Sequence, residues 1–154
     1  MISKISQGIL AGTVVLALGA GVAYAALAGD DAIKARQACM KANGASMGVM
    51  VPIIKGEKPY DAAAIEAALT KVDAACATWN DAFPDDSKTS TALKTRAKPE
   101  IWSNRKGFDD AGKVYYTAFT ALKATKDEAG FKAAFPMLGK ACGSCHENFR
   151  APEK

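Results

Sequence analysis

The sequence predicts an all-α protein, an antiparallel up-down-up-down four-helix bundle. Alanine supplies 32 of the 154 residues, which favours helix throughout the chain. Apolar residues recur at spacings of three and four in four segments, and no segment after residue 29 alternates with period two. The length fits one domain. The formal net charge of +4 comes without a basic run, which gives no indication of nucleic-acid binding.

The first 25 residues have the features of a signal peptide. Lys4 provides a positive start, residues 9–20 are apolar, and Ala23-Tyr24-Ala25 offers a cleavage site, with a second option after Ala28. The alternative is an uncleaved membrane anchor, because residues 9–29 are long enough to span a bilayer. Both interpretations imply export, and cleavage leaves residues 26–154 as one domain in the periplasm.

The first two helices are expected on either side of a short turn at residues 55–59. Asp30 or Asp31 can cap the first helix, and Asp61 can cap the second. The apolar stripe predicted for the first helix consists of Ile33, Gln37, Met40, Gly44, Met47, Val51 and Ile54. The stripe predicted for the second consists of Ile65, Leu69, Val72, Cys76 and Trp79. Two amphipathic helices joined in this way are antiparallel neighbours.

A polar segment, residues 80–98, separates this pair from the next and is predicted to be a long loop. Pro99 suits the first turn of a third helix. Its buried face is predicted to hold Ile101, Phe108, Ala111, Tyr115, Ala118 and Leu122. After a turn near residues 125–127, the last helix presents Phe131, Phe135, Leu138, Cys142, Cys145 and Phe149, with Pro136 inside it.

The strongest chemical signal is Cys142-Gly143-Ser144-Cys145-His146, because C-x-x-C-H is the attachment sequence of c-type haem. On a helix, positions i, i+3 and i+4 share one face. Both thiols can therefore form thioethers with the haem vinyl groups, while His146 binds the iron. His146 is the only histidine of the chain, so a bis-histidine haem is excluded.

Three other interpretations of the motif are weaker. A thioredoxin-like C-x-x-C belongs near a βαβ pattern, and this sequence predicts no strands. A zinc site would need Cys39 or Cys76 as fourth ligand, with a spacing that matches no common zinc module. The third is a structural disulfide beside a chance histidine.

The chain resembles the class II cytochromes c, the cytochrome c′ family, across residues 30–150. The motif lies close to the C-terminus, in Gly139 to Arg150, as in that family. Three more segments match: Arg36-Gln37, Lys55 to Asp61, and Pro99-Glu100-Ile101-Trp102. The resemblance implies a four-helix bundle that holds one covalently attached haem c between its helices.

The sixth position of the iron decides between two functions. With one histidine, it must hold methionine, lysine, another non-histidine donor, or nothing. Resemblance to low-spin family members implies a His146–Fe–Met40 pair, which suits electron transfer. The alternatives are that Met40 fills the core or covers an open iron. A high-spin, five-coordinate cytochrome c′ would instead bind NO or CO.

The resemblance also implies roles around the haem. Arg36 and Gln37 are expected to bind the haem propionates, with ordinary surface positions on the helix as the alternative. Arg150, one turn past His146, is expected against the proximal face or as a solvated charge, and Phe149 and Trp102 as haem-wall or core residues. No enzyme activity and no catalytic residue are expected, because a peroxidase would need distal acid–base groups. The expected partners are periplasmic redox proteins, together with a second copy bound through the first two helices.

The two remaining cysteines, Cys39 and Cys76, are equally far from the turn at residues 56–59. In an antiparallel hairpin they lie at the same height, and an oxidising periplasm permits a disulfide between them. The alternative is two buried free thiols that pack as small hydrophobic groups.

Overall fold

The structure, a computed structural model, describes residues 27–153. Within that range the chain is helical, apart from an isolated antiparallel bridge between Ala97 and Arg150. Its elements are α1 (Gly29–Ile54), α2 (Ala62–Ala75), the 3-10 turns η1 (Trp79–Asp81) and η2 (Asp85–Ser87), α3 (Glu100–Ser103), α4 (Arg105–Lys123) and α5 (Glu128–Phe149). The all-α prediction is confirmed. The expected signal peptide, residues 1–25, lies outside the described residues.

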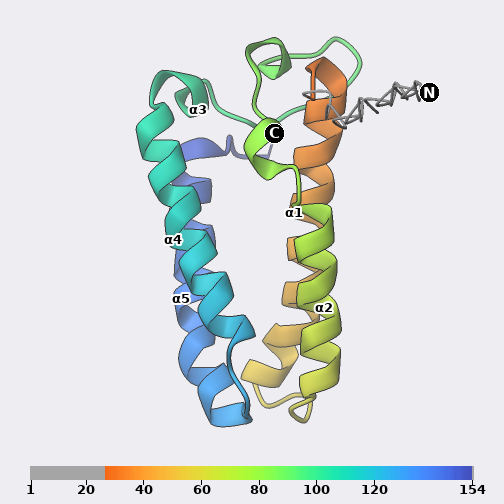
Figure 1. The fold of residues 1–154 in the computed structure, drawn as a ribbon, viewed down its shortest axis with the longest axis vertical. Helices are drawn as coiled ribbons and strands as arrows, with labels where there is room; N and C mark the ends of the chain where they lie inside the picture. Colours follow the sequence, from red (N-terminus) through yellow and green to blue (C-terminus); the bar gives the residue numbers. More distant parts are fainter. Residues whose placement is uncertain (1–26, 154) are drawn as a thin grey trace, which may run out of the picture.

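The long helices form two antiparallel hairpins that stand side by side (Figure 1). α1 packs against α2, and α4 packs against α5. The segment between α2 and α3 gathers at one end of the bundle, where the C-terminal residues also lie (Figure 1). None of the helices in the described part is both long and apolar enough to cross a membrane.

Local sequence explains where the first hairpin turns. α1 ends two residues before Gly56, whose φ of +74° is the left-handed conformation that glycine adopts without strain. Asp61 caps α2 as predicted, because its carboxylate accepts a hydrogen bond from the Ala64 N–H at 2.9 Å. α1 begins at Gly29 without a side-chain cap, so the prediction that Asp30 or Asp31 caps it was wrong. Both aspartates lie in its first turn, where the helix dipole favours negative charge.

The stripe predicted for α1 was wrong by one residue along most of the helix. The buried residues of α1 are Ala32, Ile33, Arg36, Cys39, Asn43, Ser46, Met50 and Ile53. Three of them are polar, and each is hydrogen-bonded inside the protein. A search for apolar periodicity therefore selects the neighbouring face, on which Gln37, Met40 and Gly44 are exposed.

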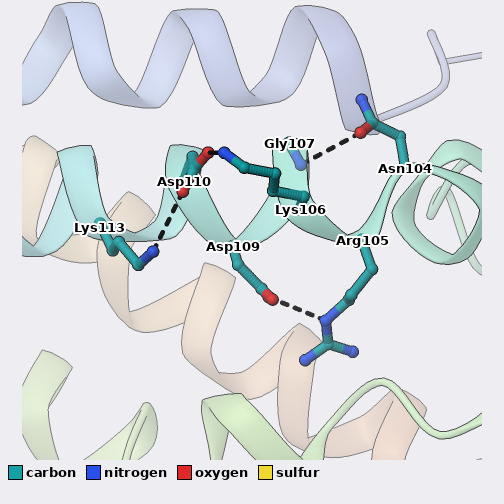
Figure 2. A network of polar contacts seen from close by, with 7 residues as sticks. All are labelled: Asn104, Arg105, Lys106, Gly107, Asp109, Asp110 and Lys113. Atoms are coloured by element: carbon teal, nitrogen blue, oxygen red, sulfur yellow. Dashed lines mark hydrogen bonds and ion pairs between the residues drawn. The ribbon is translucent and has the colours of Figure 1, made fainter.

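The predicted third helix is divided in two. Asn104, with φ −122° and ψ 57°, separates α3 from α4, and its side chain accepts a hydrogen bond from the Gly107 N–H at 3.1 Å (Figure 2). A Cβ on Gly107 would clash with the end of the Asn104 side chain, so a larger residue there would push the Asn104 amide out of its capping position. Beyond it, the solvent-exposed ion pairs Arg105–Asp109, Lys106–Asp110 and Lys113–Asp110 lie along the first turns of α4 (Figure 2).

Two apolar clusters form the core. The four-helix cluster is contributed by α1, α2, α4 and α5 and comprises Met50, Ile53, Ile65, Leu69, Val72, Ala118, Phe119, Leu122, Phe131, Leu138 and Ala141. The loop cluster joins the segment after α2 to the ends of α3, α4 and α5 and comprises Ala82, Phe83, Ile101, Phe108 and Phe149. Cys142 and Cys145 of the C-x-x-C-H motif lie between these two clusters.

Candidate haem site

The C-x-x-C-H motif lies in the last turns of α5, which the Asp127 carboxylate caps at the other end. Cys142 and Cys145 are free thiols and both are half-buried, as is His146. The three residues occupy positions i, i+3 and i+4, so their side chains leave the helix on one side. This is the arrangement that thioether attachment and axial ligation of one haem require.

The motif joins the two apolar clusters. Cys142 packs against the four-helix cluster, and Cys145 packs against the loop cluster. An apolar macrocycle attached to both sulfurs would therefore contact the apolar side chains of both clusters.

Burial shifts the pKa values of all three side chains of the motif, and the shift of His146 suits iron binding. Burial raises the pKa of the Cys142 thiol, and burial together with Cys142 raises that of the Cys145 thiol. Burial lowers the pKa of His146, and the nearby charges of Arg150 and Arg96 lower it further. At neutral pH the imidazole is therefore neutral, the form with a free nitrogen lone pair that binds a metal.

A zinc site does not fit the structure. Cys39 and Cys76, the candidates for a fourth ligand, are joined in a disulfide between α1 and the end of α2, with their Cα atoms 4.6 Å apart. Within the described residues, no group of three or more histidine, cysteine, aspartate or glutamate side chains could hold a metal ion.

The methionines differ in what surrounds them. Met50 is fully buried in the four-helix cluster, and Met47 packs against that cluster. Met137 is 55% exposed on α5. Met40 belongs to neither cluster in the described part of the chain, and its side chain is 37% exposed on α1.

Arg36 fastens the segment after α2 to α1. It is 5% exposed, and its two terminal nitrogens donate to Ala82 O, Ser87 Oγ, Ser87 O and Thr95 Oγ1 at 2.7–3.2 Å. The guanidinium also lies over the rings of Phe83 and Trp102. Gln37 donates to Lys94 O at 2.7 Å in the same segment. Sequence reasoning missed this anchoring role, since the acceptors lie about 50 residues away.

The other expected pocket residues gather at the same end of the bundle. The Trp102 indole donates to Phe83 O and Pro84 O, and Phe149 is buried in the loop cluster. Arg150 is exposed and pairs through its backbone bridge with Ala97. Phe149 thus lies in the loop cluster, and Trp102 and Cys145 both pack against it.

Sequence reasoning did not identify Asn43 and Tyr115 as a pair. The Tyr115 hydroxyl donates to Asn43 Oδ1 at 2.6 Å, which connects α4 with α1. Burial raises the pKa of Tyr115 to about 12, and the neighbouring Cys142 adds to the rise. The available signal was Asn43 itself, a polar residue inside a helix on the same side as Cys39.

A helical bundle with a free C-x-x-C-H motif between two apolar surfaces defines a c-type cytochrome. The chain belongs to the cytochrome c′ family, whose sequence model matches residues 31–150. It therefore carries a covalently bound haem c, for which Cys142 and Cys145 form the matching motif.

The relatives include proteins named cytochrome c-556 and proteins named cytochrome c′. Cytochrome c-556 of Rhodopseudomonas palustris is 40% identical over 148 residues, which cover 94% of this chain and 96% of the relative. Cytochrome c-556 of Agrobacterium fabrum is 40% identical over 138 residues, with 86% and 87% covered. Cytochrome c′ of Rhodopseudomonas palustris is 35% identical over 149 residues, with 96% and 97% covered.

Solved structures share the fold. Cytochrome c′ from Rubrivivax gelatinosus superimposes with a TM-score of 0.70 at 30% identity, covering 78% of this chain and 94% of that one. A nitric oxide complex of a cytochrome c prime mutant from Alcaligenes xylosoxidans superimposes with a TM-score of 0.69 at 31% identity, covering 80% and 96%. These matches confirm the four-helix bundle.

Proposed function

We propose that this protein is a periplasmic monohaem electron-transfer cytochrome whose iron is held by His146 and Met40. The bound haem supplies a one-electron redox centre. His146 provides the proximal nitrogen, held in place by α5, and Met40 provides a thioether from α1. Two strong protein ligands keep the coordination similar in both redox states, so that little reorganisation accompanies electron transfer.

The observation that carries this proposal is that the core packs without Met40. Met47 and Met50 are used by the four-helix cluster, and Met137 lies on the same helix as His146, nine residues before it. The Met40 side chain lies on α1 and belongs to neither cluster in the described residues. Because neither cluster uses the Met40 side chain for packing, its thioether is available as a ligand. The resemblance of the sequence to low-spin family members supports this choice.

The test is the optical spectrum of the holoprotein. A far-red methionine–iron charge-transfer band is expected in the ferric state, and the ferrous protein is expected to bind CO slowly, because CO must displace Met40. Met40→Leu is expected to remove the band and lower the reduction potential. Met47→Leu, a change of similar volume about two turns further along α1, is the matched control and is expected to keep both. A high-spin ferric spectrum of the unmodified protein would refute the proposal.

The alternative function is binding of NO or CO at a five-coordinate iron. It is favoured by one specific observation, the likeness to a cytochrome c prime solved as a nitric oxide complex. In that case Met40 would cover the iron without binding it, and CO would bind the unmodified and the Met40→Leu proteins at similar rates.

Other parts of the function rest on the family and on the local sequence. We propose that residues 1–25 direct export, that Arg36 and Gln37 lie near the haem propionates, and that Arg150 lies near the proximal face. Periplasmic redox proteins are the proposed partners, and α1 and α2 the proposed surface of a homodimer.

A further inference from the structure

We propose that the hydrogen bond between Tyr115 and Asn43 is a crossbar that holds α1 against α4 at the separation at which Met40 can bind the iron. Tyr115 and Asn43 are thus positioning residues for the sixth ligand. This inference rests on the proposed function, because it presupposes Met40 as a ligand.

The crossbar is the less exposed of the two polar links between the hairpins. Within the described residues, two side-chain bonds connect helices of the α1–α2 hairpin with helices of the α4–α5 hairpin: Tyr115–Asn43 and Lys123–Asp73. The Lys123–Asp73 ion pair is solvent-exposed on both sides, and exposed pairs contribute little. The Tyr115–Asn43 bond is short, at 2.6 Å, and partly buried, so that breaking it strands a donor and an acceptor.

The α1 end of the crossbar is rigid. Asn43 Nδ2 donates to Cys39 O at 3.0 Å and lies 3.5 Å from Cys76 Sγ. The amide is therefore oriented by the disulfide region that joins α1 to α2. Its Oδ1 is presented to α4 in a fixed direction, and a movement of α1 moves the acceptor with it.

The crossbar lies beside both halves of the iron site. Asn43 follows Met40 by three residues, so the two side chains lie about one turn apart on adjacent sides of α1. At the other end, Tyr115 and Cys142 pack against the same four-helix cluster, and Cys142 contributes to the raised pKa of Tyr115. The bond thus runs from the haem-bearing side to the helix that carries Met40. Because a metal–ligand bond tolerates deviations of only about 0.2 Å, the separation of these helices matters.

The experiment uses holoprotein and imidazole as a competing ligand for the ferric iron. Tyr115→Phe removes one hydroxyl, and its loss is expected to let imidazole displace Met40 about fivefold more readily, as one buried hydrogen bond allows. The far-red band is expected to weaken at elevated temperature in this variant. Tyr116→Phe, which alters a 68% exposed tyrosine on the same helix, is the matched control and is expected to leave both unchanged.

Asn43→Ala provides a second route in case Tyr115→Phe does not fold. It is expected to raise imidazole affinity at least as much, because it also removes the bond from Asn43 to Cys39 O. The double variant is expected to behave like Asn43→Ala, because the Tyr115 hydroxyl has no Asn43 acceptor left to lose. Unchanged imidazole affinity in Tyr115→Phe, with the band intact in the unmodified protein, would overturn the crossbar alone. Absence of the band from the unmodified protein would overturn the proposed function and this inference with it.

Discussion

Replacing both residues of the Cys39–Cys76 disulfide by alanine is expected to lower the free energy of unfolding by about 4 kcal/mol. The bond joins residues 37 apart in the sequence. A cross-link of that span removes about 13 cal/mol/K of entropy from the unfolded chain, which corresponds to about 3.8 kcal/mol at 25 °C. For a domain of this size the melting temperature is expected to fall by about 15 °C.

The assay is urea unfolding of the holoprotein, followed by far-ultraviolet circular dichroism. The control is Asp73→Asn, which breaks the exposed ion pair with Lys123 and is expected to cost less than about 1 kcal/mol. Thiol titration of denatured, unreduced holoprotein is expected to find no free thiol, because the other two cysteines carry haem. Two titrating thiols, or a loss below about 1 kcal/mol in the double variant, would refute the reasoning.

Two further predictions concern buried polar side chains. Arg36→Gln is expected to lower the free energy of unfolding by about 3 kcal/mol or more, because four hydrogen bonds to the segment of residues 82–95 depend on the guanidinium. Urea unfolding measures this loss, and Lys34→Gln, on the exposed side of α1, is expected to leave the free energy of unfolding unchanged. The pH profile tests Tyr115, whose pKa is raised from 10.0 to about 12. An unfolded chain releases the phenol proton first, so the stabilisation is complete below the unfolded pKa and is lost as the pH rises through about 12. Tyr115→Phe is therefore expected to lose less stability than the unmodified protein over that range, and parallel profiles would contradict the assignment.

The fold was predictable where local rules decide it. Apolar spacing, the Asp61 cap and the short turns indicated four helices in two hairpins, because each signal depends on residues within one or two turns. The same rules misplaced the buried face of α1. Arg36, Asn43 and Ser46 are buried because their polar groups are satisfied by partners, and periodicity of apolar residues contains no information about those partners.

The break at Asn104 shows the same limit. The sequence from Pro99 to Leu122 is compatible with one helix, and the structure ends α3 at Ser103 and begins α4 at Arg105. An asparagine followed three residues later by glycine is a local signal that could have indicated a new helix start. The helix direction changes there because Ile101 packs in the loop cluster and Trp102 packs against it. Both are tertiary contacts.

The sequence by itself determined the haem attachment motif and the histidine proposed as iron ligand, because Cys142, Cys145 and His146 are brought to one helix face by a spacing of three and four residues. Only the tertiary structure decided what faces them. Arg36 reaches acceptors about 50 residues away, and Tyr115 meets Asn43 across 72 residues of chain. Contacts over such separations are set by how the hairpins pack, and packing depends on all four helices together rather than on any local pattern.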